Sequence, residues 1–212
     1  EQVTEARRDV LQFLLSSHPL DCPICDKGGE CPLQNLTMAH EPGESRFIFD
    51  EKQLSAKNVP LGDLIFLDRE RCIQCARCIR FQDIIAGDAV LEFYNRGRAT
   101  DIITNSEPGF DSYWSGNTTD ICPVGALTSK PARYKARAWE LVEHDGIAPH
   151  DGVGSNIHIH VRRDRLMRVV PRENAAVNQT WISDRDRFSY QGLYSDDRLQ
   201  KPMLRENGKL KE

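Results

Sequence analysis

The chain has 212 residues, of which 28% are charged and 39% are hydrophobic, and its formal net charge is −4. This composition is that of an ordinary soluble globular protein. The net negative charge argues against a nucleic-acid partner, because such binding usually needs a basic patch. No apolar run approaches the roughly 18 residues of a membrane span, and no signal peptide is visible. If the protein works at a membrane, we expect it to dock onto integral partners without inserting.

The first segment, residues 3–15, is predicted to be a helix. Its apolar side chains recur near one helical stripe, made by Val3, Ala6, Val10, Phe13 and Leu14. This stripe is expected to pack on the loop that follows.

The rest of the chain shows patterns typical of short strands and helices. An extended segment at 59–68 is expected to lead into a cysteine-rich loop, and a short helix at 78–85 to follow that loop. The other predicted elements are a turn at 40–44 with His40 at the surface, strands at 90–94 and 99–104 joined by a turn at 95–97, a helix at 129–140, and strands at 158–161 and 166–170 joined at 163–165. Arg133, Lys135 and Arg137 on the predicted helix would form a solvated face or dock a partner.

Seven cysteines and one histidine divide into two complete sets of four metal ligands, with no cysteine left over. The first set is His18, Cys22, Cys25 and Cys31, and the second is Cys72, Cys75, Cys78 and Cys122. Eight ligands in this arrangement predict two four-coordinate metal centres.

The spacing of the second set favours an iron–sulfur cubane. A C-x2-C-x2-C run lets three thiolates of one tight loop converge on one cluster, and a fourth ligand must come from elsewhere. In two-cluster ferredoxins that ligand is a Cys-Pro three residues beyond the run, but here that position is Gln82. The remote Cys122, followed by Pro123, is the remaining candidate. Zinc is the main alternative, and the triple run argues against it because zinc sites usually take two ligands per loop.

The first set alone leaves iron–sulfur and zinc nearly balanced. Pro19 biases His18 away from helix, and Gly28 and Gly29 would let the backbone fold closely around an inorganic core. An imidazole ligand makes a cluster less negative, which tends to raise its potential. A disulfide framework is disfavoured by the odd cysteine count.

Both cysteine-rich stretches resemble a known family. Residues 18–34 (HPLDCPICDKGGECPLQ) resemble the histidine-ligated cluster motif of the large iron–sulfur subunit of NADH:quinone oxidoreductases, respiratory complex I. Residues 71–81 (RCIQCARCIRF) and 120–127 (DICPVGAL) resemble the all-cysteine cluster motif of the same subunit. Iron-only hydrogenases and NAD-linked formate dehydrogenases share the first motif, but they are expected to continue with two ferredoxin-type runs. The single run here favours complex I.

The resemblance implies an α+β fold in three parts. A [4Fe-4S] domain with one histidine and three cysteine ligands is expected at 1–50, and an all-cysteine [4Fe-4S] ferredoxin-like domain at 51–143. Residues 144–212 resemble the β-rich start of a molybdopterin-oxidoreductase domain. The family's N-terminal two-iron domain is not present in this sequence, so we expect the chain to be a fragment or a shortened gene product.

The third part is expected to lack its own cluster. Ala148, Asp151, Ser155 and Ser183 stand where that domain often carries four cysteines. His144, His150, His158 and His160 lie nearby. The alternation around His158 and His160 is that of a half-buried strand with its histidines on the solvated face, and this is favoured over a replacement metal site.

The resemblance implies an electron-transfer subunit of an oxidoreductase, with electrons passing from a flavin subunit through two [4Fe-4S] clusters towards quinone. Expected partners are the flavin- and NADH-binding subunit and the quinone-side iron–sulfur subunits. The expected location is the cytoplasmic face of a bacterial inner membrane or the mitochondrial matrix side. No Gly-rich phosphate loop follows a strand, so no NADH or flavin site is expected in this chain. No molybdenum cofactor is expected either. The alternatives are an electron-input module of a formate dehydrogenase or iron hydrogenase, and a zinc-stapled structural module. Arg71, Arg77 and Arg80 are candidates for tuning cluster potential, and the alternative is that they are surface charges.

Overall fold

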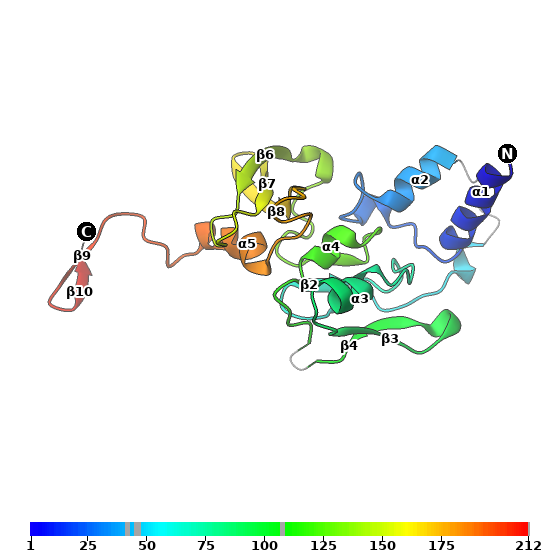
Figure 1. Cartoon of the computed structure of the whole chain (residues 1–212), viewed down its shortest axis with the longest axis horizontal. Coiled ribbons are helices and arrows are strands. Elements are labelled where there is room, and N and C mark those ends of the chain that lie inside the picture. The colour runs from blue at the N-terminus through cyan, green and yellow to red at the C-terminus, as the bar shows by residue number, and fades with distance from the viewer. Residues whose placement is uncertain (41–42, 45–47, 107–108, 212) are drawn as a thin grey trace.

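The computed structural model describes residues 1–40, 43–44, 48–106 and 109–211, and it combines short helices with small antiparallel sheets (Figure 1). This confirms the predicted α+β class. The helical segments, with η marking 3-10 turns and in one case a π turn (η3), are α1 (Gln2–Leu15), η1 (Cys22–Ile24), α2 (Pro32–His40), η2 (Phe49–Glu51), α3 (Arg77–Arg80), η3 (Phe81–Ile85), η4 (Gly97–Ala99), α4 (Asn117–Ile121), η5 (Ala138–Glu140), α5 (Asp184–Phe188) and η6 (Ser189–Tyr194).

Four small sheets organise the strands. Their orders are β1-β2-β5, β3-β4, β6-β7-β8 and β9-β10, and all neighbouring strands are antiparallel. The strands are β1 (Val59–Pro60), β2 (Ile65–Leu67), β3 (Leu91–Tyr94), β4 (Asp101–Thr104), β5 (Leu127–Ser129), β6 (Val142–Ile147), β7 (Asn156–Arg162), β8 (Arg165–Pro171), β9 (Leu204–Glu206) and β10 (Lys209–Lys211).

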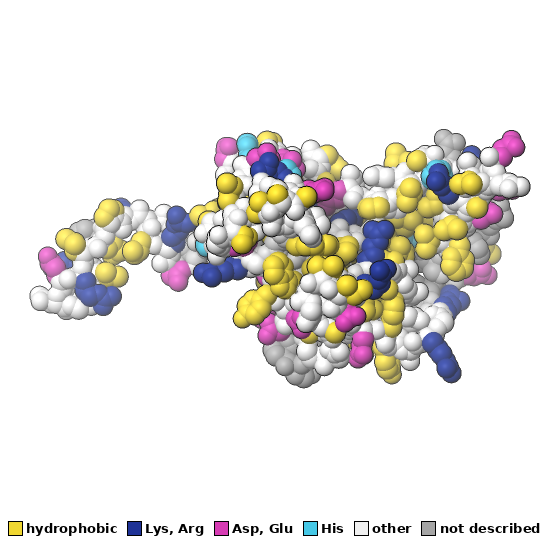
Figure 2. All heavy atoms as spheres, viewed as in Figure 1, with side chains coloured by type: hydrophobic (Ala, Val, Ile, Leu, Met, Phe, Trp, Pro, Cys, Tyr) yellow, Lys and Arg dark blue, Asp and Glu magenta, His cyan; other side chains and the backbone are white. Residues whose placement is uncertain are grey.

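The N-terminal helix α1 forms as predicted, but only part of the face expected to pack does so. Val3, Val10 and Phe13 are 64%, 58% and 77% exposed, whereas Leu11 is buried. The helix packs on the body through Leu11, Leu14 and Leu15 and lies beside α2 (Figure 1), so the rest of the predicted stripe is left in solvent. Figure 2 shows hydrophobic side chains at the surface of this end of the molecule.

Two predictions in the middle of the chain need correction. Residues 59–68 form a tight hairpin of β1 and β2 and not one extended piece. The helix predicted at 129–140 does not form: its first residue belongs to β5, which pairs with β2, and only the short turn η5 is helical. One helical turn closes, with Arg133 N–H donating to Ser129 O at 2.9 Å, but Tyr134 then has a left-handed backbone (φ 61°) that ends it.

The helix after the cysteine run and the β3–β4 hairpin are confirmed. The helix runs through α3 and η3, and the hairpin pairs Leu91 with Thr104 and Tyr94 with Asp101. The helices α2 and α4 were not predicted. The turn expected at 40–44 falls partly outside the described residues, and His40 is the half-buried last residue of α2.

In the last third, β7 and β8 form the predicted hairpin, closed by Arg163 and Asp164 in left-handed conformations (φ 50° and 60°). The sequence did not indicate β6, which adds a third strand. The prediction that His158 and His160 form a solvated face is wrong for His160. That residue is 8% exposed, because Glu143 of β6 and Arg168 of β8 flank its ring.

The hydrophobic core joins the parts of the chain that carry the cysteines. One cluster contains Leu11 and Leu33 from the first part, Leu67 and Leu127 from the second, and Phe188 from α5. A smaller cluster lies under β7 and β8. Beyond η6 the chain extends away from the body to the β9–β10 hairpin (Figure 1). Among the described residues, no helix is both long and apolar enough to cross a membrane.

Candidate metal centres

The second cysteine set begins in a loop whose backbone turns sharply. Gln74 and Ala76, on either side of Cys75, both have left-handed conformations (φ 53° and 61°). Non-glycine residues rarely adopt this conformation, and such strain is typical of functional sites. The loop turns Cys72 and Cys75 towards Cys78, which is buried in α3.

The fourth thiol of this set comes from a separate element. Cys122 follows α4 directly, and its N–H donates to Thr118 O at 3.1 Å. The structure brings it to the loop: all four thiols line one small cavity, with Ile73, Ala76 and Arg77 also in its wall. The ligand set predicted from spacing alone therefore converges in three dimensions.

The chemistry of these thiols fits a resident metal cluster. Burial, with a smaller contribution from the neighbouring thiols of the set, raises the pKa of Cys72 and of Cys78 to about 12. Burial also raises the pKa of Cys122. Four crowded thiols of this kind lose their protons only to a cation bound among them, because metal coordination deprotonates a thiol.

The first set is built on a compact loop. Cys22 opens η1, Cys25 ends it, and Cys31 precedes α2, whose first residue is Pro32. Gly28 donates its N–H to Cys25 O at 3.0 Å, and a β-carbon at Gly28 would lie 3.1 Å from the same oxygen. Burial raises the pKa of the Cys25 thiol, while the Arg71 guanidinium opposes this rise. The thiols of Cys31 and Cys22 also act on the pKa of Cys25, so the three thiols form one group.

His18 lies just after α1 with its imidazole largely buried. Burial, with smaller contributions from the charges of Lys52 and Arg71, lowers its pKa from 6.5 to about 4. The ring is therefore neutral at physiological pH, which is the state that binds a metal. Its Nδ1 atom is buried and has no hydrogen-bond partner in the described part of the chain, as expected for an atom that binds a ligand. The ring lines a second cavity, which reaches Cys72 of the other set.

A segment 100 residues away secures the first loop. Arg137 donates through Nη1 to Cys25 O at 2.8 Å and through Nη2 to Pro23 O. Trp139 packs so closely over Gly29 (φ 90°) that a β-carbon there would collide with the indole. Cysteine spacing gives no signal for either residue, and the predicted helix at 129–140 placed Arg137 on a face exposed to solvent or to a partner.

The two ligand sets lie next to each other. Cys31 Sγ is 3.5 Å from Pro123 O, the carbonyl directly after Cys122. Two residues further on, Gly125 packs against Cys25 Sγ so tightly that any side chain there would overlap the sulfur. One short segment, residues 122–125, therefore contacts both sets.

Buried ion pairs surround this contact. Arg71, 1% exposed, binds Asp21 Oδ2 through Nε at 2.9 Å and lies 3.4 Å from Asp68 Oδ2. Lys57 pairs with the same two carboxylates and with Glu70. Although burial alone would raise the pKa of Asp21, hydrogen bonds from Lys57 and Arg71 hold it below its usual value. The ionised network ties the loop before Cys22 to the segment before Cys72.

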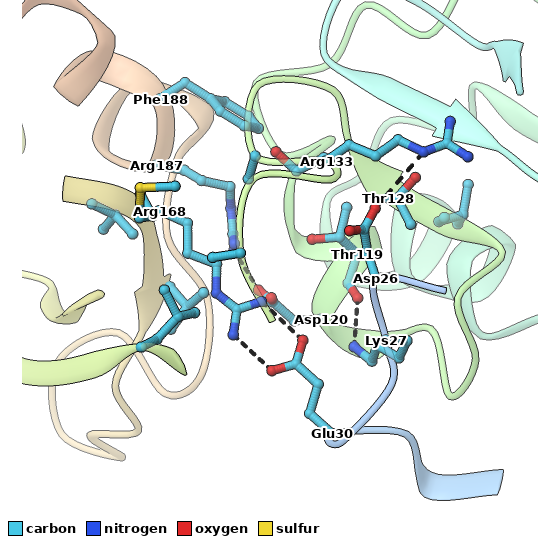
Figure 3. A pocket seen from close by; sticks show the side chains of 18 of the residues that line it. Asp26, Lys27, Glu30, Thr119, Asp120, Thr128, Arg133, Arg168, Arg187 and Phe188 are labelled. Carbon is cyan, nitrogen blue, oxygen red and sulfur yellow. Dashed lines mark hydrogen bonds and ion pairs between the residues drawn. The ribbon is translucent and has the colours of Figure 1, made fainter. Parts of the chain in front are cut away.

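A charged cleft separates the first loop from the β6–β8 sheet (Figure 3). Arg168 reaches across it from β8 and makes two bonds to Glu30, at 2.9 and 2.7 Å. Arg187 of α5 pairs with Asp120 of α4. Burial raises and Arg168 lowers the pKa of Glu30, with a net decrease. These pairs fix the sheet against the residues that precede Cys31 and Cys122.

Four tail positions stand where the resembling domain often carries cysteines, and here they have structural roles. Asp151 accepts N–H bonds from Val153, Gly154 and Ser155 and closes its own loop. Ser183 caps α5 by accepting from Asp186 N at 3.1 Å. Ala148 and Ser155 are buried.

Two of the tail histidines, His158 and His160, lie beside carboxylates of β6. His158 Nδ1 lies 3.1 Å from Asp145 and 3.3 Å from Glu143. His144 and His150 are exposed.

Three family models match successive parts of the chain. Residues 7–46 match the NADH-ubiquinone oxidoreductase-G iron-sulfur binding region. Residues 62–128 match the ferredoxin-like domain of NADH-quinone oxidoreductase subunit 3. Residues 142–191 match the NDSU1/NuoG-like 4Fe-4S domain of NADH-ubiquinone oxidoreductase, although this stretch contains no cysteine.

Curated relatives match along almost the whole chain. The G subunit of the Rickettsia typhi NADH-quinone oxidoreductase is 50% identical over 99% of this chain, which is 31% of the relative's length. The NADH-ubiquinone oxidoreductase 75 kDa subunit of Reclinomonas americana is 49% identical over 99% of this chain and 30% of its own length. The mitochondrial iron-sulfur protein 1 of the Solanum tuberosum NADH dehydrogenase is 50% identical over 95% of this chain, which is 27% of its own length. The chain thus spans about a third or less of these relatives.

Among solved structures, a chain of the NAD+-reducing [NiFe]-hydrogenase in the H2-reduced state is similar to this protein. Its sequence is 31% identical, the TM-score is 0.55, and the match covers 64% of this chain and 58% of that chain. Together with the three family models, the matches show that this chain belongs to the family of the G and 75 kDa subunits of NADH-quinone oxidoreductases, in the part that carries 4Fe-4S binding domains.

Proposed function

We propose that this chain relays electrons between two [4Fe-4S] clusters as part of an NADH:quinone oxidoreductase. His18, Cys22, Cys25 and Cys31 would hold one cluster, and Cys72, Cys75, Cys78 and Cys122 the other. When bound, such clusters accept and donate single electrons. The chain's own residues provide ligands, spacing, charge and exclusion of water.

The observation that carries this proposal is the close contact of the two ligand sets. Cys31 Sγ lies 3.5 Å from the carbonyl oxygen of Pro123. A ligand of the first set is therefore in direct contact with the residue that follows Cys122 of the second set. Two structural zinc sites have no need to adjoin, whereas an electron relay requires neighbouring centres. The buried surroundings of Cys31, Cys78 and Cys122 would keep water away from that contact.

The proposal extends to partners and place. The flavin- and NADH-binding subunit would supply electrons, and quinone-side iron–sulfur subunits would take them onward. The exposed apolar side chains of α1 are consistent with a peripheral subunit in a larger assembly. That assembly would lie on the cytoplasmic face of a bacterial inner membrane, or on the matrix side of the mitochondrial one. The tail, which has no cysteine, would hold no third cluster.

A second candidate function is electron input to a hydrogenase, favoured by the structural similarity to the NAD+-reducing [NiFe]-hydrogenase chain. The three relatives described at 49–50% identity are all NADH dehydrogenase subunits, so the quinone-linked function is preferred. Reduction of the loaded complex by NADH in the absence of hydrogen, with transfer to quinone, would separate the two.

Ligand variants followed by low-temperature electron paramagnetic resonance test the assignment. Cys122→Ser is expected to abolish one reduced-cluster signal and His18→Ala to alter only the other. A single substitution that removes both signals would overturn the two-set assignment. A colourless protein with two zinc ions and no sulfide would replace the relay by a structural module.

A further inference from the structure

Gly125 marks the place where the two cluster loops meet. It lies three residues after Cys122, yet its surroundings come from elsewhere in the chain. A β-carbon at this position would overlap Cys25 Sγ, and it would lie 3.3 Å from Lys27 Cβ and 3.7 Å from Arg71 Cδ. A cationic residue from each loop therefore passes the segment that contacts both ligand sets.

Arg71 precedes Cys72 in sequence but extends towards the first set. Its Nε binds Asp21, the residue before Cys22. The side chain is almost completely buried, and Nη1 is a buried donor with no partner in the described part of the chain. A buried, unpaired guanidinium N–H is costly, so an acceptor is expected there. The acceptors still to be placed beside Cys25 are the sulfur atoms of a cluster.

Lys27 makes the opposite crossing. It lies in the first loop, between Cys25 and Cys31, but its Nζ donates to Thr119 O at 2.9 Å (Figure 3). Thr119 is in α4, directly after the residue whose carbonyl accepts the N–H of Cys122. The ammonium group therefore lies beside the helix that delivers the fourth ligand of the second set.

We propose that the two loops exchange cations: Arg71 supplies positive charge and a hydrogen-bond donor to the His18/Cys22/Cys25/Cys31 site, and Lys27 supplies positive charge to the Cys72/Cys75/Cys78/Cys122 site. This rests on the proposed function. Reduction adds one negative charge to a cluster, and a nearby buried cation stabilises that charge. Hydrogen bonds to cluster sulfurs and net charge set the potential. Each cation thus raises the potential of the cluster held by the other loop.

Redox titration of the anaerobically purified chain, followed by electron paramagnetic resonance, tests the exchange. Arg71→Gln is expected to shift the midpoint of the histidine-ligated cluster to a more negative value, and Lys27→Gln to shift that of the all-cysteine cluster. Arg71→Lys and Lys27→Arg keep the charge and are expected to shift the midpoints less. Arg77 is the matched control. It lies six residues after Arg71 and lines the cavity formed by Cys72, Cys75, Cys78 and Cys122. Arg77→Gln is therefore expected to shift the midpoint potential of the all-cysteine cluster, the one held by its own loop.

The outcomes separate this inference from the proposed function. The signals are first assigned with the ligand variants, and absence of iron would end the proposed function before any cation is tested. The exchange is refuted if both signals are assigned and each substitution shifts the midpoint potential of the cluster held by its own loop, or of neither cluster. Such a result would leave the proposed function intact. Arg71→Gln removes a partner of the buried carboxylates of Asp21 and Asp68, and this variant can therefore fail to load the histidine-ligated cluster. In that case Lys27→Gln decides, because the partner of Lys27 is a neutral carbonyl.

Discussion

Gly125→Ala is expected to remove the histidine-ligated centre and to leave the all-cysteine centre in place. The new methyl group would fall well inside the ~3.5–4.0 Å of ordinary contact from Cys25 Sγ. The same β-carbon would lie 3.3 Å from Lys27 Cβ and 3.7 Å from Arg71 Cδ, so these side chains also limit how far the methyl group can move. The sulfur must therefore shift by about an ångström or more. A metal–sulfur bond of ~2.3 Å does not survive such a shift unchanged.

The cost follows from the packing. Inserting a methyl group into a dense site costs about 1–3 kcal/mol, and each kcal/mol lowers the melting temperature of a chain of this size by about 2–4 °C. We expect a decrease of about 2–12 °C, and iron and sulfide near four each per chain in place of about eight. Gly152→Ala is the control, because nothing lies within 4 Å of its β-carbon position. A Gly125→Ala chain that loads both clusters with unchanged signals would refute this account of residues 122–125.

Three further substitutions test the surroundings of the first site. Arg137→Leu removes two hydrogen bonds to carbonyls of the first loop, including that of Cys25; we expect a loss of about 1–3 kcal/mol and faster release of iron to a chelator from that site only. Arg168→Met breaks the two-bond pair with Glu30, in which the Arg168 and Glu30 side chains are 26% and 32% exposed. We expect the free energy of unfolding to decrease by about 1–2 kcal/mol, between the values for exposed and buried pairs, and the urea midpoint to decrease with it. In the metal-free chain, burial lowers the pKa of His18 from 6.5 to about 4, so only the unfolded chain takes up this proton between those values. The free energy of unfolding of that metal-free chain is expected to decrease as pH falls from 6.5 towards 4, and His18→Gln to flatten that slope.

Controls for these substitutions lie on the C-terminal hairpin. Arg205→Leu and Lys211→Met change exposed side chains of β9 and β10, and neither is expected to alter iron release or the urea midpoint. An Arg137→Leu chain that releases iron from both sites equally would contradict a local role. Unchanged stability of Arg168→Met would mean that the Arg168–Glu30 pair does not help to hold the β6–β8 sheet against the first loop. A pH slope that His18→Gln leaves intact would assign the proton to another group.

The ligand residues were accessible from sequence because spacing constrains chemistry directly. Three cysteines within seven residues favour one shared centre, and in the structure Cys122 lines the same cavity as these three. Short hairpins were also accessible, since Arg163 and Asp164 form the left-handed turn between β7 and β8. These features depend on neighbours in sequence.

The rest of the site depends on contacts between distant residues, which one sequence does not reveal. Nothing in the sequence distinguishes Arg71, buried beneath the other loop, from Arg77, which lines its own. The helix predicted at 129–140 failed because its first residue belongs to β5 and because Tyr134 has a left-handed backbone (φ 61°) in the middle of the segment. His160 was expected in solvent because β6, the strand that covers it, has a weak pattern of its own.

Iron, acid-labile sulfide and zinc content of the anaerobically purified chain tests the central claim most directly, together with electron paramagnetic resonance after reduction. The account predicts about eight iron and eight sulfide per chain, the sum for two cubanes, with two distinct reducible signals. Two zinc ions per chain and no sulfide would contradict it.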